Sequence, residues 1–261
     1  MNTLTHTALV TAAAQGIGAA TAQRLAAMGM NLVLVDVSGP QLHETAEALR
    51  KDGAKVCEVV ADVTDCRAID DAIDLALEAF QRIDVLANIA GGGGARNVQH
   101  IDEIAIDEWD HIVGLNLRST FLWCRAVVPH MRRHQYGRIV NMSSTIARGR
   151  HGPAGSAGAR LAYASAKAGI LGFTAQLAKD VGRHGITVNA VLPWLTLSAA
   201  NSRVRQRYEA LDAQVRENLL ALSPMGRPGT AQEVAAAIAF LASPEASFIS
   251  GTGLPVDGAY L

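Results

Sequence analysis

Residues 11–18 read Thr-Ala-Ala-Ala-Gln-Gly-Ile-Gly, and this small, glycine-bearing stretch decides the fold. An apolar run, His6–Thr11, precedes it, and Ile17–Met28 follows with the apolar spacing of a helix. A second apolar run, Asn31–Val35, comes next and ends in Asp36. We therefore predict a strand, a tight turn, a helix and a second strand.

The same alternation continues along the chain. Further strands are predicted at Lys55–Val60, Asp84–Ala87, Arg138–Asn141 and Thr187–Leu192, and helices at Gln41–Lys51, Asp65–Gln81, Asp107–His134 and Ala162–Arg183. The strands are apolar without alternation, which is typical of a parallel sheet covered on both faces. No linker or repeat interrupts the pattern. We predict an α/β fold, a Rossmann-like doubly wound parallel sheet, in a single domain over residues 1–261.

Composition excludes several classes of protein. The 261 residues carry a formal net charge of −1, so no basic excess indicates a nucleic-acid partner. Three scattered cysteines argue against a disulfide framework and fit a reducing compartment. No apolar run reaches membrane-spanning length and no signal peptide is evident, so we expect a cytoplasmic protein without a membrane partner. His130 and His134 have metal-ligand spacing but no evident third ligand, so no metal is predicted.

Unusual residues follow the ends of the predicted strands, where ligands bind in such sheets. Gly16 and Gly18 would let backbone N–H groups approach a pyrophosphate at the helix N-terminus, although a tight turn alone could also require them. Asp36 lies where an acid binds the adenosine ribose, or else it serves as a turn or capping residue. A carboxylate repels a 2′-phosphate, and Gln15 and Ser38 offer no cation to attract one. These residues favour NAD over NADP.

Tyr163 and Lys167 are four residues apart and share one helix face. A free phenol has a pKa of about 10, and a fixed cation beside it lowers that value. The pair could therefore transfer a proton to or from an alcohol near neutral pH. The spacing alone favours an exposed helix face, so the hypothesis depends on the rest of the chain.

In combination, these residues resemble the short-chain dehydrogenase/reductase family, in its common single-domain branch. The resemblance covers essentially the whole chain. It depends on motifs in a specific order: residues 11–18, Asp62-Val63, Asn88-Ile89-Ala90-Gly91, Asn116, Ser144, Tyr163-x-x-x-Lys167, Pro193, Ser250-Gly251 and Val256-Asp257-Gly258.

The resemblance implies a role for each matching residue. Tyr163 would transfer the proton, Lys167 would lower its pKa and hold the nicotinamide ribose, Ser144 would bind the substrate oxygen, and Asn116 would hold a water that links Lys167 to solvent. The cofactor-binding residues would be Gly16, Ile17, Gly18, Asp36, Asp62, Val63, Asn88, Gly91, Tyr163, Lys167, Pro193 and Thr196. Hydride would pass between a carbinol carbon and the nicotinamide.

Three departures from the family pattern stand out. Ala12 replaces a usual Gly and fits only if its φ stays negative, so the phosphate loop could be reshaped. Trp194 replaces the Gly that usually follows Pro193, and it would either close over the nicotinamide or substrate or lie at an interface. The stretch between Ser144 and Tyr163 is longer than usual, with an active-site insertion at residues 148–160 that is rich in Gly and Pro.

The insertion contains four cationic or titratable residues, which could bind an anionic or hydroxylated substrate or simply be solvated: Arg148, Arg150, His151 and Arg160. By resemblance, residues 195–222 would form a substrate lid. The segment Phe248–Leu261, and the helices at Asp107–His134 and Ala162–His184, would form subunit contacts in a homotetramer or homodimer.

We therefore expect an NAD-dependent oxidoreductase of the CH–OH group that interconverts a secondary alcohol and its carbonyl. The substrate would be a small polar sugar, polyol or hydroxy acid, possibly anionic. Reduction of a 3-oxoacyl thioester is an alternative, which NADP dependence would accompany. A non-catalytic nucleotide-binding scaffold is a second alternative, and the presence of Asn116, Ser144, Tyr163 and Lys167 argues against it.

Overall fold

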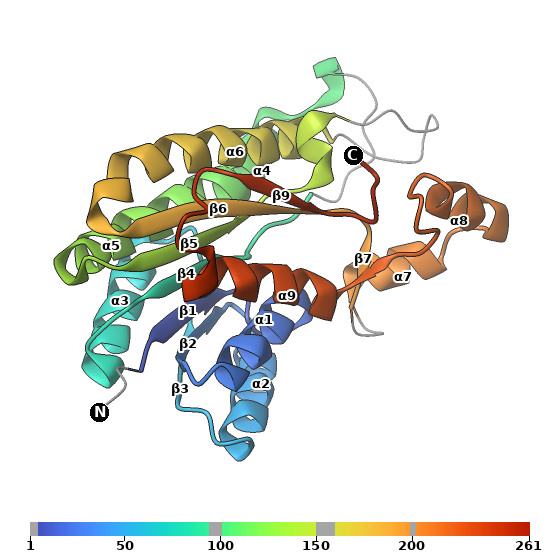
Figure 1. The fold of residues 1–261 in the computed structure, drawn as a ribbon. Helices are drawn as coiled ribbons and strands as arrows, with labels where there is room; N and C mark the ends of the chain where they lie inside the picture. The colour runs from blue at the N-terminus through green and yellow to red at the C-terminus, as the bar shows by residue number, and fades with distance from the viewer. Residues whose placement is uncertain (1–4, 94–100, 150–159, 199–201) are drawn as a thin grey trace.

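The fold is a parallel sheet between two layers of helices (Figure 1). This computed structural model describes residues 5–93, 101–149, 160–198 and 202–261. Seven strands pair in the order β3-β2-β1-β4-β5-β6-β9, and every pair is parallel. The predicted α/β fold with a doubly wound sheet in one domain is confirmed.

The strands of this sheet are β1 (Thr7–Thr11), β2 (Asn31–Asp36), β3 (Val56–Val60), β4 (Val85–Asn88), β5 (Gly137–Met142), β6 (Ile186–Pro193) and β9 (Gly253–Val256). The helices are α1 (Gly16–Ala27), α2 (Gly39–Lys51), α3 (Cys66–Phe80), α4 (Ile106–Val113), α5 (Ser119–His134), α6 (Leu161–Val181), α7 (Arg203–Glu209), α8 (Ala213–Leu220) and α9 (Ala231–Ala242). A small second sheet pairs β7 (Thr196–Leu197) with β8 (Gly229–Thr230).

Each face of the central sheet has its own apolar core. Helices α1, α2 and α9 cover one face, and α3, α5 and α6 cover the other (Figure 1). Strands β1, β2, β4, β5 and β6 are almost wholly buried, which explains why their sequences are apolar without alternation. Helices α7 and α8 project from one end of the sheet instead.

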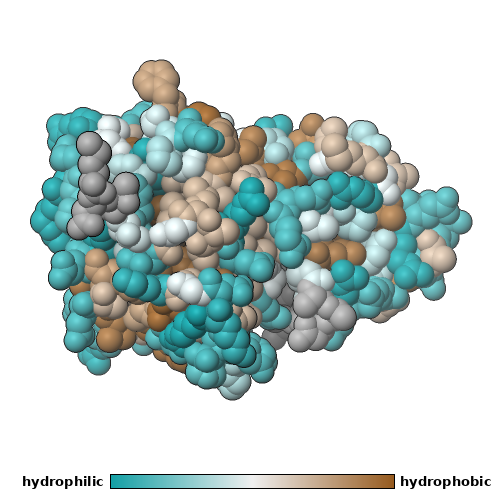
Figure 2. All heavy atoms as spheres, turned by 60° about the horizontal axis from the view of Figure 1, so that its bottom comes forward, coloured by the Kyte–Doolittle hydropathy of each residue, from teal (hydrophilic) through white to brown (hydrophobic). Residues whose placement is uncertain are grey.

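The predicted helical stretch Asp107–His134 is continuous but not α-helical throughout, because a π-helical turn, Gly114–Arg118, lies between α4 and α5. Residues 202–222, part of the segment that we expect to form a lid, contain two short helices, α7 and α8. In Figure 2, the end of the molecule that α7 and α8 form shows single apolar side chains among mostly hydrophilic ones. Exposed apolar side chains of this part are Val204, Val215, Leu222 and Met225.

The turn after β1 differs from the prediction at Ala12. Its φ is +54°, in the left-handed region, whereas we expected an alanine there to keep φ negative. Left-handed backbone costs a residue with a Cβ about 1–2 kcal/mol, and the tight turn outweighs that cost here. The turn is tight because the backbone of Gly18 packs against that of Ala12: a Cβ on Gly18 would lie 1.9 Å from the Ala12 carbonyl oxygen.

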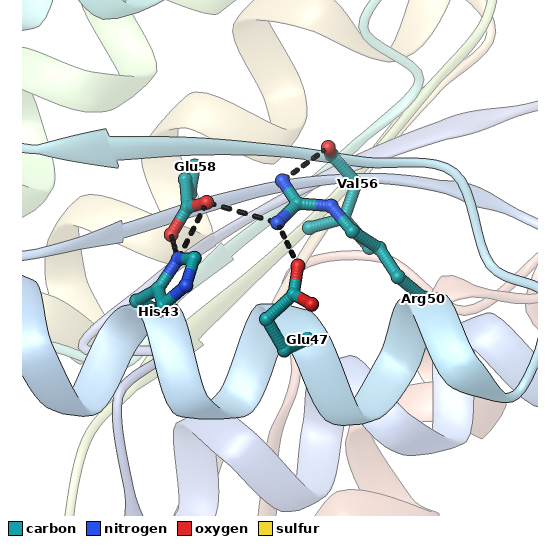
Figure 3. A network of polar contacts seen from close by, with 5 residues as sticks. All are labelled: His43, Glu47, Arg50, Val56 and Glu58. Carbon is teal, nitrogen blue, oxygen red and sulfur yellow. Dashed lines mark hydrogen bonds and ion pairs between the residues drawn. The ribbon is translucent and has the colours of Figure 1, made fainter.

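The edge strand β3 is flanked by an ionic cluster that joins it to α2 (Figure 3). The Arg50 guanidinium donates to Glu47 and Glu58, both at 2.9 Å, and to the Val56 carbonyl oxygen at 3.0 Å. The His43 ring contacts Glu58 at 3.2 Å. Burial raises the pKa of Glu58, but the bonds from Arg50 and His43 outweigh it, so this pKa lies below its usual value. Charges on an edge strand also discourage pairing with another chain.

Among the described residues, no helix is both long enough and apolar enough to cross a membrane. Within the same ranges, no group of three or more His, Cys, Asp or Glu side chains could hold a metal ion.

Replacing Gly18 with Ala should disrupt the turn, because its new methyl group would overlap a backbone carbonyl that cannot swing aside. We expect the free energy of unfolding to fall by at least about 2 kcal/mol. Gly29→Ala is the matched control, since Gly29 has a φ of +80° but open space around its Cβ position. It should cost only about 1 kcal/mol. Urea denaturation measures both, and equal losses would contradict the steric explanation.

Candidate active site

The carboxyl ends of the central strands meet at one edge of the sheet. This edge gathers the glycine turn after β1, Asp36 at the end of β2, the glycines after β4, and Ser144 after β5. Helix α6 begins at the same edge and contributes Tyr163 and Lys167. Residues far apart in the sequence thus lie at one edge of the sheet, where ligands bind in folds of this kind.

Tyr163 lies in the first turn of α6, against the end of β5. Its hydroxyl shares a hydrogen bond with the Ser144 hydroxyl. The ring packs beside Gly93, whose Cβ position is 3.6 Å from the ring. Ser144 also caps the short helical turn Thr145–Arg148, where its oxygen accepts the Ile146 N–H at 3.4 Å. The two predicted catalytic hydroxyls are therefore neighbours.

The pKa of Tyr163 is raised above its usual value of 10.0. Burial is the main cause, and the Ser144 hydrogen bond and the Arg160 charge oppose it. This differs from the expected lowering by Lys167. Burial therefore favours the neutral phenol of Tyr163, the form that can donate a proton.

Lys167 is one of the largest fully buried side chains of the described residues, with 1% of its surface exposed. Its Nζ donates to the Met142 carbonyl oxygen at 2.7 Å and lies 5.5 Å from the centre of the Tyr163 ring. Burial lowers its pKa to about 7. The amine can therefore take up or lose a proton in the physiological range, one helical turn from the phenol.

Asn116 is buried in the π-helical turn between α4 and α5. Its amide donates to the Gly92 oxygen at 2.9 Å and the Ile112 oxygen at 2.8 Å, and its Oδ1 accepts the Gly92 N–H at 3.2 Å. A Cβ on Gly91 would lie 2.5 Å from this Oδ1 and 3.1 Å from the Lys167 Nζ. Gly91 thus lets the backbone after β4 approach both side chains.

The residues at the start of α1 fit a dinucleotide cofactor. No side chain caps the N-terminus of this helix, so its first N–H groups are open to a phosphate. Gly16 has a φ of +62°, and the crowding around Gly18 leaves no room for a side chain there. Asp36 accepts the N–H groups of Ala14 and Ser38 with its two oxygens, each at 3.0 Å. Each oxygen keeps a lone pair for a ribose hydroxyl.

The other residues predicted to line the cofactor lie in different environments. Asp62 is exposed and accepts the Thr64 N–H and hydroxyl at 2.8 Å each, while Val63 is buried in the core beneath it. Asn88 is 4% exposed and donates to Asn141 at 2.9 Å, within the sheet. The side-chain amide of Asn88 therefore links β4 to β5. Ile17 is half-buried and packs against the core around α9.

The loop after β6 borders the site. The Pro193 carbonyl oxygen accepts the Ser144 hydroxyl at 3.4 Å, and the Thr196 hydroxyl donates to the Trp194 oxygen at 3.2 Å. This loop also brings Ser198 to the glycine turn, where its Oγ lies 3.6 Å from the Gly16 Cβ position. Our sequence reasoning missed Ser198, because a lone serine two residues after Thr196 carries no signal until the loop is folded.

The insertion is only partly within the described residues. Arg148 is exposed at the end of the turn after Ser144, and Arg160 is exposed where α6 begins. The charge of Arg160 is one of the effects that oppose the raised pKa of Tyr163. Arg150 and His151 lie outside the described residues.

Comparison with known proteins identifies the relatives of this chain. The family model described as enoyl-(acyl carrier protein) reductase matches residues 11–260. The short-chain reductase protein NovJ of Streptomyces niveus is 39% identical over 251 residues, which cover 96% of this chain and 92% of NovJ. The 3-oxoacyl-[acyl-carrier-protein] reductase FabG of Salmonella typhimurium is 37% identical over 251 residues, 96% of this chain and 95% of FabG.

A solved structure has the same fold over nearly its whole length. YwfH, described as an NADPH-dependent reductase involved in bacilysin biosynthesis, superposes with a TM-score of 0.89. It is 25% identical, and the match covers 98% of each chain.

The buried Lys167 should make stability depend on pH. Its pKa is about 7 in the folded protein against 10.5 in a model compound, so between these values the folded state binds fewer protons than the unfolded chain. The free energy of unfolding should therefore rise from pH 7 to pH 9 in the cofactor-free protein. Lys167→Met should lose this rise and be more stable at pH 7 by roughly 1–3 kcal/mol.

Urea denaturation at both pH values measures the effect, and Lys179→Met, an exposed lysine on the same helix, is the control. The control should keep the pH dependence of the wild type. A Lys167→Met variant with the same pH dependence as the control would contradict the buried-amine assignment.

Proposed function

This chain belongs to the short-chain dehydrogenase/reductase family, and we propose that it is an NAD-dependent enzyme that interconverts a secondary alcohol and its carbonyl. Membership makes it an oxidoreductase that uses a nicotinamide cofactor and acts on CH–OH or C=O groups. The observation that supports our proposal most directly is the contact of the Tyr163 and Ser144 hydroxyls beside the buried Lys167.

The proposed chemistry assigns one task to each side chain. When bound, the nicotinamide cofactor supplies or accepts a hydride at the reacting carbon. Ser144 donates a hydrogen bond to the substrate oxygen and orients it toward Tyr163. The neutral phenol of Tyr163 gives its proton to that oxygen in reduction, and the phenolate removes the proton in oxidation.

Lys167 supports this proton transfer through its charge. When protonated, its ammonium favours the phenolate of Tyr163 and counters the effect of burial. Asn116 holds the backbone after β4 in place beside the Lys167 Nζ, through its two bonds to Gly92. Its proposed water contact would use the remaining lone pair of Oδ1.

Asp36 supports NAD as the preferred cofactor. Its carboxylate lies at the end of β2 and is fastened to the glycine turn through the Ala14 N–H, where the adenosine ribose would bind. A 2′-phosphate would meet this charge at close range. YwfH is an NADPH-dependent relative, so we base the preference on Asp36 alone.

The proposed reaction predicts two variant phenotypes. Wild-type kcat/KM should favour NADH over NADPH by at least about tenfold, and Asp36→Asn should reduce this ratio about tenfold, because it removes the charge but keeps the shape. Tyr163→Phe should abolish turnover and leave NADH binding largely intact, since the ring remains and only the hydroxyl that transfers the proton is lost.

Steady-state kinetics on secondary alcohols and ketones, read at the NADH absorbance band, measure the turnover. Fluorescence titration measures NADH binding. Equal use of both cofactors by the wild type would contradict the role of Asp36 and favour 3-oxoacyl-thioester reduction, which the FabG relationship also suggests. Turnover by Tyr163→Phe would contradict the proposed mechanism.

We propose a small polar substrate, such as a sugar, polyol or hydroxy acid, with an anionic group near Arg160. Both side chains are exposed, but the charge of Arg160, unlike that of Arg148, is among the effects on the pKa of Tyr163, so Arg160 is our first candidate. Arg150 and His151 are further candidates from the sequence. The cytoplasmic location and the homotetrameric or homodimeric assembly stay predictions.

Arg160→Gln should lower kcat/KM for a hydroxy-acid substrate about tenfold and change that for its methyl ester less than threefold, because only the acid carries the charge. Arg148→Gln is the matched comparison and should have the smaller effect. Equal kinetics of both variants on acid and ester would exclude anion recognition by these arginines.

A further inference from the structure

An aromatic stack lies at the carboxyl edge of the sheet, outside the groups that transfer the proton. The rings of Trp194 and Tyr260 are 5.3 Å apart between centroids, and their planes differ by 18°. Trp194 follows β6, and Tyr260 follows β9. The pairing of these two strands continues beyond their ends, since the Trp194 N–H donates to the Val256 carbonyl oxygen at 3.3 Å.

The stack is adjacent to the proposed reaction centre. Pro193 directly precedes Trp194, and its carbonyl oxygen accepts the Ser144 hydroxyl. Ser144 in turn contacts the Tyr163 hydroxyl. The carbonyl group that contacts Ser144 therefore belongs to the peptide bond between Pro193 and Trp194, and Ser144 is the residue that would bind the substrate oxygen.

The segment that carries Tyr260 is held firmly. The Asp257 carboxylate accepts the N–H groups of Ala259 and Leu261 at 3.1 and 2.9 Å, which closes a tight turn around Tyr260. The buried Ser223 hydroxyl donates to the Gly258 carbonyl oxygen at 2.9 Å. A ring presented by such a turn loses little conformational freedom on contact with a ligand.

Trp194 depends on this support. Its side chain is only half-buried, and no described residue accepts a hydrogen bond from its indole N–H. Buried indole groups usually have such an acceptor. With the described residues, the Trp194 ring therefore makes packing contacts, and the stack on Tyr260 fixes the orientation of the indole.

We propose that the Trp194–Tyr260 stack is a wall of the substrate site that selects a flat, unsaturated or aryl group next to the reacting carbon. Trp194 contacts that group, and Tyr260 is a positioning residue that holds the indole. Stacked rings add attraction beyond the apolar area they bury, and a saturated ring of the same size cannot supply it. This inference assumes the reaction centre of the proposed function and, among the substrates proposed there, favours a hydroxy acid that carries a flat group over a sugar or polyol.

Binding of two matched ketones tests the proposal without turnover. Acetophenone and cyclohexyl methyl ketone share a carbon skeleton, and only the first is flat. Their dissociation constants are measured by calorimetry on the full chain saturated with NAD. We expect the wild type to bind acetophenone at least fivefold more tightly than cyclohexyl methyl ketone.

Three variants separate recognition from simple structural support. Trp194→Leu should bring the ratio close to one, Tyr260→Leu should lower it at least threefold, and Tyr260→Phe should restore it, because the ring remains. The affinity for NAD should stay within twofold in both Tyr260 variants. The near-ultraviolet circular dichroism of the stack should be lost in Tyr260→Leu and kept in Tyr260→Phe.

A wild type that binds both ketones equally, or fails to bind acetophenone, would overturn the inference. So would a Trp194→Leu variant that keeps the aryl preference, or a Tyr260→Leu variant that loses only stability. These outcomes are distinct from failure of the proposed function, which would appear as absent NADH-linked turnover while the aryl preference in binding persists.

Discussion

Parallel pairing of every strand in the central sheet is the constraint on which the site depends. Because the strands share one direction, their carboxyl ends meet at one edge and their connections must cross over the faces as helices. The register is specific: Asn88 pairs with Asn141, and Pro193 with Val256. In this register β5 ends one residue beyond β4, and β6 and β9 end together two residues further. A shift of β5 against β6 would separate the hydroxyl after β5 from the loop after β6.

The reaction centre is built at a cost to the stability of the fold. A lysine amine that is removed from water and given one carbonyl partner is poorly stabilised as a cation. A phenol buried nearby is likewise poorly stabilised as an anion. Burial favours the neutral form of each group. A charge on either group would nevertheless stabilise the opposite charge on the other. The low polarity of the surroundings therefore makes their protonation states interdependent.

Sequence patterns predicted the sheet because buried parallel strands leave a clear trace of apolar runs. The glycine turn, Asp36, Ser144 and the pair Tyr163 and Lys167 could also be located, since each follows a strand or starts a helix. The conformation of Ala12 could not, because it depends on the crowding between its carbonyl and Gly18. Neither could the contact of Ser198 with the glycine turn, nor the stack on Tyr260, since these join segments whose separation in sequence conveys nothing about distance in space.

The π-helical turn at Gly114–Arg118 changes the direction in which the side chains of the following helix point. Successive residues of an α-helix are about 100° apart around the axis, and a π turn contains one residue more than a regular turn. The turn therefore rotates the buried face of α5 relative to that of α4. Asn116 can face the backbone after β4 while the following helix still directs Trp123 and Val127 into the core. The additional residue of the π turn thus lets one continuous helical segment contact both the backbone after β4 and the core, which lie in different directions.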